Sequence, residues 1–538
     1  MRTRTRAVTA GVLFVALCAL EAGAQQPAPQ TPPGSSQIQP ALKSFSDVYG
    51  LIEQNYASPL APDPTIYGPP QSNSIGAIPA MLRTLDPHSN FFDPTSFAQM
   101  QEEMRGDYYG VGMQIGERPG KNGKMAVVVE QPLPDSPAFS AGLRPGDVIS
   151  GVDGKATTGM DTAKVRDILR GPANTTVLIT VTREGAPHPL QFTLKRQKIT
   201  QHSVDAAFMV RPGIAYIHIN TFNETTDPEL SAALDRLGQE SFKGLILDLR
   251  QNRGGLLNQA VGVASHFLRK NQLVVYHSGR SSPEQKYYAV HGEQGPEYPI
   301  IVLIDNDTAS AAEIVTGALQ DHDRAMVMGQ QSFGKGLVQT EEPLSDNTML
   351  LLTTAHYYTP SGRLIQREYS NLSTYDYYNH YDPNPLPRSQ ARLTDGGREV
   401  FGGRGITPDV AVPPVKLNAT EQKLVDAGAF FDFGRSYLAT HKSVPGDFRV
   451  NGRVLDEFKK FLPSESVSVS AQDFKANEAF IRQHIQTQLV QVIYGPEAAE
   501  RITVEDDPLV ARALGSFDQA RQILAHAQRY MASRGINQ

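Results

Sequence analysis

One serine, one lysine and one glutamine stand in an order that suits covalent catalysis. Ser310 follows the apolar run 299–304 and begins a helical pattern, and Lys335 comes 25 residues later. A serine hydroxyl is a weak nucleophile and needs a general base. Lysine can act as that base only when neutral, so a site that uses Lys335 must lower its pKa from about 10.4 by removing it from water. Gln339, four residues after the lysine, can hold its amine by a hydrogen bond.

The same residues also fit plainer patterns. Ser310-x-x-Glu313 is a capping box, in which the hydroxyl accepts from a free amide at a helix start. A G-x-x-x-x-G-K sequence ending at Lys335 is close to a phosphate-binding loop, but Gly336 replaces the Ser or Thr that would bind magnesium, and a strand pattern follows. Ser332-x-x-Lys335, with S-D-N after it, resembles penicillin-recognising enzymes, although no K-T-G follows. G-x-S-x-G and H-E-x-x-H are absent from the sequence.

Strand and helix patterns surround these residues. Apolar runs at 213–219, 244–249, 299–304 and 325–328 predict buried strands, and the pattern over 256–268 predicts a helix. Strands that alternate with helices are typical of an α/β layer architecture. Because acyl transfer develops an oxyanion, the site also needs two amide donors, and the amide after the nucleophile, on Ala311, can supply one.

The stretch 308–339 resembles the tail-specific, or C-terminal-processing, serine peptidases. It shares with them the serine itself and the A-S-A-x-E-I, A-L-Q-D, F-G-K-G and V-Q elements, in the same order and spacing. The resemblance implies a Ser/Lys dyad in which Ser310 is the nucleophile and Lys335 the general base. It also implies that Gln339 orients the lysine.

The resemblance extends to the loop that completes an oxyanion hole. In this family a glycine of the segment D-L-R-x-N-x-G-G supplies the second amide, beside that of Ala311. The segment D-L-R-Q-N-R-G-G occurs here, and both Gly254 and Gly255 match. By itself this segment would be interpreted as a glycine-rich connection between a strand and a helix.

The middle of the chain resembles a PDZ domain of the bacterial protease type. The resemblance rests on S-P-A-F-S-A-G-L-R-P-G-D-V-I at 136–149 and on Y-G-V-G-M at 109–113, which matches the carboxylate-binding loop. Such a loop binds a peptide's terminal carboxylate through backbone amides while the peptide adds to the sheet as a strand. The candidate peptide-binding residues are Gly110, Val111, Gly112, Met113, Val165 and Leu169.

The N-terminus predicts export. Three arginines precede an apolar run that ends at Leu20, and A-G-A at 22–24 fits a cleavage site, so 1–24 is predicted to be a signal peptide and not a membrane span. The one cysteine, Cys18, lies in it, which excludes disulfides, thiol catalysis and cysteine-bound metal in the mature protein. Removal of three arginines and one glutamate changes the formal charge from −6 to −8, and disfavours nucleic acid as a partner.

The sequence therefore predicts a multidomain α/β (α+β) protein. A turn histidine, His88 in L-D-P-H-S, is interpreted as structural, and a Tyr-, Asn- and Gly-rich insertion is expected to cover the cleft. The predicted parts are a signal peptide (1–24), a flexible linker (25–40), a helical N-terminal region (41–107), a PDZ domain (108–197), a serine peptidase core (198–414, with the insertion at 367–403) and a helical C-terminal appendage (415–538).

These features predict an exported serine endopeptidase, periplasmic or otherwise extracytoplasmic, that binds protein substrates by their C-termini. Neither metal nor cofactor is implied, and no membrane span is expected after signal removal. The alternative is a catalytically silent PDZ scaffold that only binds peptides, and the intact Ser310, Lys335 and Gln339 argue against it. The physiological substrate and the oligomeric state stay open.

Overall fold

The computed structural model divides the chain into two compact units, Met1–Ala77 and Ile78–Gln538. The predicted signal peptide and the linker as far as residue 34 lie outside the described residues. The described residues are 35–55, 66, 76–119, 124–291, 297–344, 347–370, 372–379, 388–441, 444–446, 448–465 and 467–534. Within them, no helix combines the length and the apolar character needed to cross a membrane.

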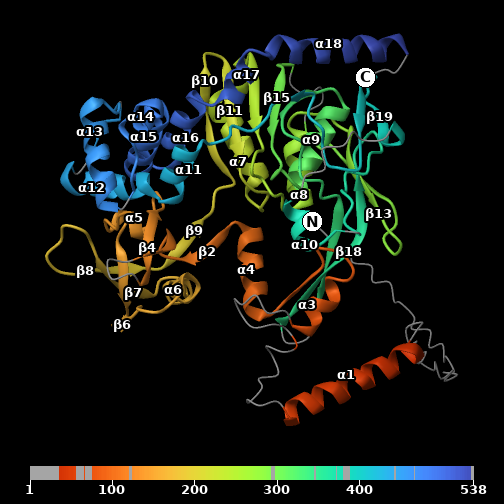
Figure 1. Ribbon diagram of the computed structural model, residues 1–538. Helices are drawn as coiled ribbons and strands as arrows, with labels where there is room; N and C mark the ends of the chain where they lie inside the picture. The colour runs from red at the N-terminus through yellow and green to blue at the C-terminus, as the bar shows by residue number, and fades with distance from the viewer. Residues whose placement is uncertain are drawn as a thin grey trace, which may run out of the picture. The chain divides into compact units, whose positions relative to one another are not determined.

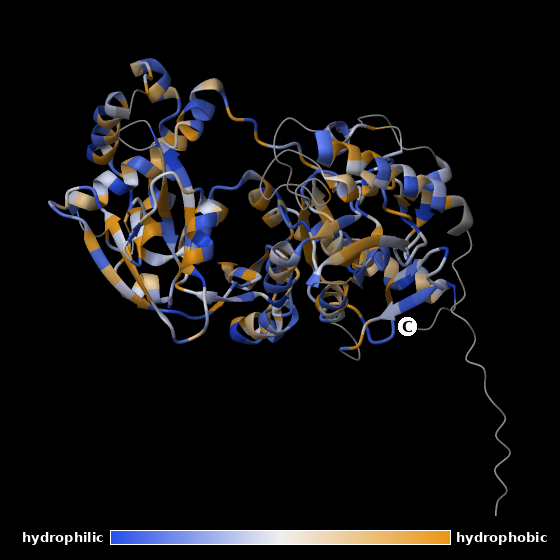
Figure 2. Ribbon diagram, turned by 90° about the horizontal axis from the view of Figure 1, so that it is seen from below, coloured by the Kyte–Doolittle hydropathy of each residue, from blue (hydrophilic) through white to orange (hydrophobic). Residues whose placement is uncertain are grey.

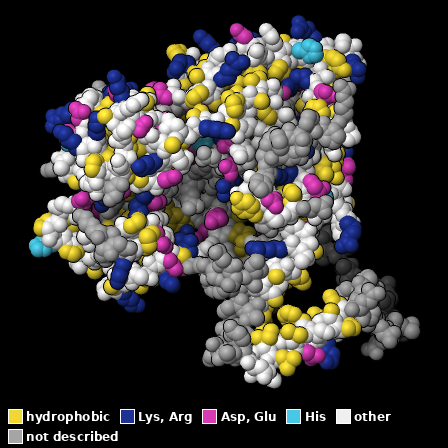
Figure 3. Space-filling view, viewed as in Figure 1, with side chains coloured by type: hydrophobic (Ala, Val, Ile, Leu, Met, Phe, Trp, Pro, Cys, Tyr) yellow, Lys and Arg dark blue, Asp and Glu magenta, His cyan; other side chains and the backbone are white. Residues whose placement is uncertain are grey.

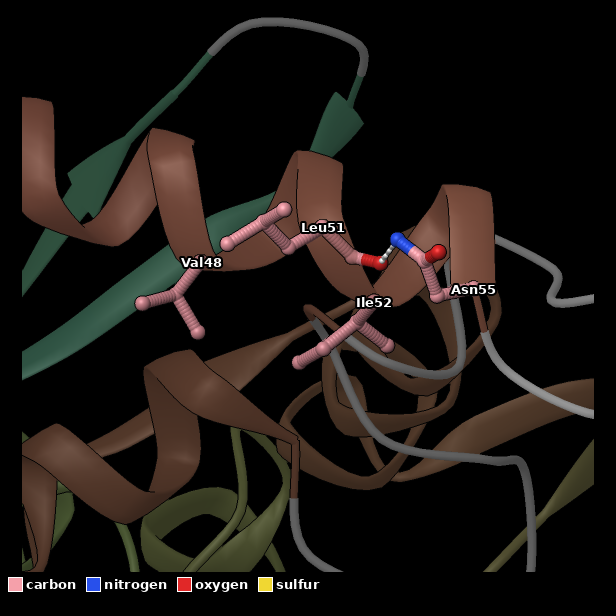
Figure 4. A pocket seen from close by; sticks show the side chains of 4 residues that line it. All are labelled: Val48, Leu51, Ile52 and Asn55. Carbon is pink, nitrogen blue, oxygen red and sulfur yellow. Dashed lines mark hydrogen bonds between the residues drawn. The ribbon is translucent and has the colours of Figure 1, made fainter.

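The first unit is represented by one helix, α1 (Ser35–Asn55). Its apolar side chains recur at helical spacing and are exposed, for example Phe45 at 51% and Val48 at 55%, and hydrophobic side chains gather along α1 in Figure 3. Figure 4 shows Leu51 and Asn55 among the residues that line a shallow pocket on this helix. Residues 35–40 (S-S-Q-I-Q-P), predicted as the end of a flexible linker, instead form the first part of α1.

The second unit is built around a six-stranded sheet with the strand order β10-β11-β12-β15-β16-β21 (Figure 1). β10 is antiparallel to β11, and the other pairs are parallel. The four strands predicted from apolar runs are confirmed as β11, β12, β15 and β16. The strand bounds are β10 (Val204–Arg211), β11 (Ile214–Ile219), β12 (Gly244–Asp248), β15 (Ile300–Ile304), β16 (Ala325–Gly329) and β21 (Val410–Ala411).

Helices cover both faces of this sheet, as expected for parallel strands that are apolar on both sides. Along β12, Leu245 and Leu247 pack on one face, whereas Ile246 packs on the other. Figure 2 shows the central strands as hydrophobic. The first face is covered by α7 (Thr226–Leu237), α8 (Leu257–Ser265) and α9 (Ala311–Asp321), and the second by α16 (Pro496–Glu505), α17 (Pro508–Leu514) and α18 (Phe517–Ser533).

A second sheet brings distant segments together beside the first. Leu351 of its long strand β18 pairs with Asn90 of β1 and with Glu341 of β17, so the turn before β1 lies near β17. This pairing places β1, which lies in the predicted helical N-terminal region, close to the segment that follows Lys335. The bounds are β1 (Asn90–Phe92), β13 (Leu273–Ser278), β14 (Gln285–Tyr288), β17 (Leu337–Pro343) and β18 (Met349–Tyr358), and α3 (Ala77–Leu82) and α4 (Pro94–Arg105) flank β1.

The predicted PDZ region forms its own sheet and core. The strand order is β3-β4-β5-β7-β8 with β6 beside β5, so β3 is an edge strand. Pairing of β2 (Asp107–Gly110) with β9 (Gln197–Thr200) brings the two ends of the module together. The other bounds are β3 (Met113–Pro119), β4 (Met125–Pro132), α5 (Pro137–Ser140), β5 (Val148–Val152), β6 (Lys155–Ala156), α6 (Thr162–Leu169), β7 (Thr176–Thr182) and β8 (Leu190–Lys195).

The C-terminal helices divide into two groups with different partners. Ile485 and Leu489 belong to a separate helical core, whereas Val510, Leu514 and Phe517 pack on the central sheet. Part of the predicted appendage is therefore a structural layer of the peptidase region. The separate core contains α11 (Ala419–Asp426), α12 (Ala429–His441), α13 (Gly452–Phe461), α14 (Ala471–Ala476) and α15 (Glu478–Tyr494).

Candidate active site

Ser310 lies at the start of α9, after the buried strand β15 and the turn 305–309. Its backbone has φ 55° and ψ −117°, a left-handed conformation that residues with a side chain rarely adopt. Such strain persists only where the surroundings hold it, and it is concentrated at functional sites. The predicted position of a nucleophile between a strand and a helix thus coincides with a strained residue.

The turn before Ser310 is held against the glycine-rich loop. Ala309 donates its amide to the carbonyl of Asn252 at 2.9 Å, and Gln251 donates its amide to Asp305 Oδ1 at 3.0 Å. These two bonds run in opposite directions between the two loops. The nucleophile turn and the candidate oxyanion loop therefore form one rigid connection.

Gly254 is packed against the start of α9. A Cβ added at Gly254 would lie 2.6 Å from the Cβ of Ser310 and 2.9 Å from the amide nitrogen of Ala311. Its φ of +94° also disfavours any side chain. Gly255 (φ +140°) approaches a different group, because a Cβ there would lie 2.1 Å from the carbonyl oxygen of Phe222. Both positions require glycine, for different contacts.

The amides of these two glycines are used differently. Gly254 donates its N–H to Asn252 Oδ1 at 2.8 Å. Among the described residues, neither the Gly255 amide nor the Ala311 amide donates a hydrogen bond to another residue. Gly255 and Ala311 therefore each keep a backbone donor available for a ligand.

One buried carboxylate joins the serine and lysine segments. Glu313 Oε2 accepts from the amides of Ser310 and Lys335, each at 2.8 Å, and Oε1 accepts from the Gly334 amide at 2.7 Å and the Ser332 hydroxyl at 2.5 Å. Burial raises the pKa of Glu313, and these hydrogen bonds oppose the rise. Four donors around two oxygens suit an ionised carboxylate, which only accepts.

The side chain of Lys335 is directed by Gln339. Lys335 Nζ donates to Gln339 Oε1 at 3.1 Å, and Gln339 Nε2 donates to the carbonyl of His88 at 2.6 Å. Burial lowers the pKa of Lys335. Within the described residues, no hydrogen bond joins Lys335 Nζ to the Ser310 hydroxyl. Candidate bases are often further from their partners before substrate binds.

The L-D-P-H-S turn supports this arrangement from the N-terminal region. Asp86 Oδ1 accepts from the amides of His88 and Ser89, both at 2.7 Å, and Thr353 of β18 donates its amide to the Ser89 hydroxyl at 3.1 Å. Burial, and then the charge of Lys335, lower the pKa of His88 to about 4. His88 is therefore neutral at pH 7, and its backbone carbonyl, not its ring, binds Gln339.

The predicted insertion supplies a side chain to the same cluster. Tyr377, on α10 (Thr374–Asn379), is 1% exposed, and its hydroxyl lies 2.8 Å from His88 Nε2. The rings of His88 and Phe333 also pack edge to face with Tyr377. α10 thus packs against His88 and Phe333. The described part of the insertion also contains the short hairpin of β19 (Ala391–Leu393) and β20 (Glu399–Phe401).

The competing motifs do not form the sites that they suggest. Ser332 is 5% exposed and donates to Glu313, and its segment is not helical, so it lacks the geometry of an S-x-x-K nucleophile. The segment after Lys335 is the strand β17, whereas a phosphate-binding loop would be followed by a helix. The predicted capping box of Ser310 and Glu313 is present, and in it Glu313 accepts from the Ser310 amide at 2.8 Å. This bond does not prevent a catalytic position.

The candidate peptide-binding loop, residues 110–113, is held by hydrogen bonds to the start of α5. The Val111 carbonyl accepts from the Ala138 amide at 2.9 Å, and the Gly112 carbonyl accepts from the Ser136 hydroxyl at 2.7 Å. Gly112 has φ +74°, and a Cβ there would lie 2.3 Å from the Cβ of Ser136. Gly110 ends β2, directly before this turn.

The strand β3 and the helix α6 follow this loop in the chain and contact each other. Met113 begins the edge strand β3, which has a free side for strand addition. Glu117 of β3 accepts from the Thr162 amide at the start of α6, at 3.0 Å. Val165 and Leu169 are 0% and 5% exposed in the module's core, so they offer a peptide little surface in this state.

Two residues of this site were missed or underrated by sequence analysis. Glu313 was recognised only as a cap, because its bonds to Gly334 and Lys335 span 21 and 22 residues. Tyr377 carried no motif at all. A signal existed for Glu313 in the S-x-x-E pattern, whereas the partnership of Tyr377 with His88 spans 289 residues and has no sequence signature.

Comparison with known proteins identifies two domains. The sequence model of Peptidase family S41 matches residues 213–371, and that of the PDZ domain matches 128–183. A carboxy-terminal-processing protease of Bartonella bacilliformis is 39% identical over 329 residues, which cover 60% of this chain and 72% of that protein. A carboxyl-terminal-processing protease of Synechocystis sp. is 38% identical over 295 residues, covering 54% of this chain and 68% of that protein.

The chain is also similar to the solved structure of a photosystem II D1 C-terminal processing protease. It is 31% identical to this chain, covers 62% of this chain and 80% of its own, and superimposes with a TM-score of 0.33.

Proposed function

Since the chain belongs to the carboxy-terminal-processing proteases of peptidase family S41, we propose that it is an exported serine endopeptidase with a Ser310/Lys335 dyad. The observation that carries this proposal is the Glu313 carboxylate, which accepts from the backbone amides of both residues at 2.8 Å. One buried carboxylate thereby fixes the backbone positions of the nucleophile and the base relative to each other. Export is proposed from the arginines and the apolar run of 1–24.

The proposed reaction is a two-step acyl transfer. The neutral amine of Lys335 takes the proton of the Ser310 hydroxyl as its oxygen attacks the scissile carbonyl, and the resulting ammonium then gives a proton to the leaving amine. Water hydrolyses the acyl-enzyme with Lys335 again as base. Burial favours this role, because it lowers the pKa of Lys335 and raises the neutral fraction.

The oxyanion that forms in both steps needs two donors. The Ala311 amide and the Gly255 amide are proposed, since the Gly254 amide already donates to Asn252 Oδ1 at 2.8 Å. Gly254 then serves by its missing side chain, which lets the loop approach Ser310 closely. Fixed amides in a site that excludes water stabilise the developing charge without reorganisation.

The dyad is tested by covalent labelling. A fluorophosphonate probe is expected to modify purified mature protein at a single serine, and mass spectrometry of the digested protein should locate the probe on Ser310. Pre-incubation with a cleaved peptide should slow the labelling. A silent scaffold would remain unlabelled, and labelling at another serine would remove Ser310 from the role of nucleophile.

The pH dependence of cleavage is expected to report the ionisation of Lys335. A base works only when neutral, so kcat/KM should rise with pH to a plateau, with a midpoint below 10.5, because burial lowers the pKa of Lys335. Gln339→Glu places a negative charge beside Nζ, which favours the ammonium and raises its pKa. The rise in kcat/KM should therefore shift to higher pH, by about tenfold in rate per pKa unit on the acid side.

The matched control for this shift is Gln285→Glu on β14, where the side chain is exposed. It adds the same charge to the surface of the neighbouring strands and should leave the profile unchanged. Equal profiles for wild type and Gln339→Glu would show that Lys335 is not the titrating base.

Substrate choice is proposed to depend on the free C-terminus. Charge-assisted hydrogen bonds to a carboxylate are roughly twice as strong as those to a neutral group, so the amide loop 110–113 should bind free-acid peptides better than amidated ones. Loss of such a contact costs about 1–3 kcal/mol. Wild type should therefore cleave a free-acid peptide roughly ten- to a hundredfold faster than its amide at low peptide concentration.

Gly112→Val should remove this preference and leave Ser310 open to the fluorophosphonate probe, because its side chain meets Ser136 while the peptidase sheet is untouched. Gly185→Val is the matched control, since Gly185 has a similar φ of +78° but no neighbour within 4 Å of an added Cβ. Equal wild-type rates for the two peptides would mean that this module does not recognise C-termini.

A further inference from the structure

Three side chains that bind metals in other proteins meet outside the candidate active site. Asp227 lies in the first turn of α7, His266 caps the end of α8, and His291 follows β14. One ligand atom from each lies within 4.8 Å of the others. α7 and α8 lie side by side on the sheet face (Figure 1), so two of the three ligands come from a packed helix pair.

The two imidazoles approach opposite oxygens of one carboxylate. His266 Nε2 lies 2.7 Å from Asp227 Oδ1, and His291 Nε2 lies 3.8 Å from Oδ2. The two rings are 5.2 Å apart and tilted by 33°.

The backbone around the three residues is fixed by bonds that do not use the ligand atoms. The Asp227 amide donates to Gln259 Oε1 of α8 at 2.9 Å, and the Val290 amide donates to Ser265 Oγ at 3.0 Å. A Cβ added at Gly262 of α8 would lie 2.6 Å from Asp227 Cγ. The helix backbone therefore approaches the carboxylate closely, and each histidine is adjacent to an anchored residue.

From this convergence we propose that Asp227, His266 and His291 bind a divalent transition metal ion, with Zn²⁺ as the best match. Two imidazoles and one carboxylate suit zinc, which takes nitrogen and carboxylate ligands in tetrahedral sites. Magnesium and calcium favour oxygen ligands, and metals that prefer thiolate ligands would find no cysteine among these three residues. Three protein ligands leave one tetrahedral position for water.

Only small side-chain movements are needed to reach zinc geometry. Zinc–nitrogen bonds of about 2.0–2.1 Å place neighbouring tetrahedral ligands roughly 3.3 Å apart. The 2.7 Å contact must therefore lengthen and the 3.8 Å contact must shorten, each by about half an ångström, and the two imidazole nitrogens, which lie within 4.8 Å of each other, must approach by at most about 1.5 Å. The side chain of His291 is 50% exposed, which gives it freedom to rotate and gives an ion a path of entry.

A plain ion pair is the competing explanation, and the chain contains a comparator for it. His202 Nδ1 lies 2.9 Å from Glu229 Oε1, on the same helix α7 as Asp227. No second histidine is grouped with that pair in the part of the chain that the structure describes. A metal site at Asp227 should thus depend on His291, whereas an ion pair should not.

The test is Zn²⁺ titration of tag-free mature protein by isothermal calorimetry, after chelator treatment and buffer exchange. Wild type should bind one Zn²⁺ per chain and should melt at a higher temperature with Zn²⁺ than without it, because the ion binds only the folded state. MgCl₂ should give neither effect. His266→Ala and His291→Ala should each weaken Zn²⁺ binding by about ten- to a hundredfold or more. His202→Ala should bind Zn²⁺ as wild type does.

His291→Ala is the decisive variant, because a half-exposed side chain can be removed without disturbing the core. Circular dichroism before titration verifies the fold of each variant. Absence of Zn²⁺ binding by wild type, or undiminished binding by His291→Ala, would overturn the proposal. Neither result bears on the Ser310/Lys335 dyad, which the labelling experiment tests separately.

Discussion

Lys335→Arg protein is expected to fold and to cleave no peptide bond at measurable rate. Arginine keeps the positive charge but cannot lose its proton in a protein, so it cannot accept the proton of Ser310. Loss of a general base typically costs about 10²–10⁴-fold in rate. Ser310→Ala should be equally inactive, because it removes the nucleophile. The measurement is kcat/KM with a fluorogenic peptide, with melting temperatures recorded for every variant.

The effects of the two substitutions should not multiply. Residues that serve one proton transfer act as a unit, so the double variant should be no slower than either single one. Lys335→Met provides a second test if the guanidinium does not fit, since methionine has a similar length and no charge. Lys286→Arg, at an exposed position on β14, is the matched control and should retain full activity. Appreciable turnover by folded Lys335→Arg would remove the dyad from consideration.

The strands that present Ser310 could be predicted because they are buried on both faces. β12 and β15 are buried throughout, so β15 is an unbroken apolar run and β12 is apolar from Leu245 to Leu247, before Asp248. Glycines with forced conformations were similarly visible, and both Gly254 and Gly255 have positive φ. Local physical requirements of this kind leave local sequence patterns.

Contacts between distant segments leave no such pattern. The His88 carbonyl accepts from Gln339, 251 residues away. Every residue has a backbone carbonyl, so the sequence does not show which one is used. Val165 and Leu169 were likewise predicted to bind peptide, but the sequence could not tell whether these apolar side chains would line a pocket or fill a core, where the structure places them. Phe517 was assigned to an appendage for the same reason, since only the sheet face shows what it covers.

Glu313→Gln is expected to impair both stability and catalysis. An amide offers one acceptor oxygen, so its NH₂ group would face either the Ser310 and Lys335 amides or the Gly334 amide and Ser332 hydroxyl. A buried donor left without an acceptor costs about 1–3 kcal/mol. The melting temperature should fall, and kcat/KM should fall further than stability explains, because Ser310 and Lys335 are no longer held by one anion.

Glu342→Gln is the matched control, because it makes the same change at an exposed position of β17. Ser332→Ala separates the two effects. This substitution removes one donor to Glu313 Oε1, while Oε2 still accepts from the Ser310 and Lys335 amides. It should therefore lower stability and largely spare kcat. If folded Glu313→Gln kept the wild-type kcat/KM and the wild-type rate of fluorophosphonate labelling, the carboxylate would be a structural cap only. The alignment of nucleophile and base would then depend on the strained backbone of Ser310 and on Gln339.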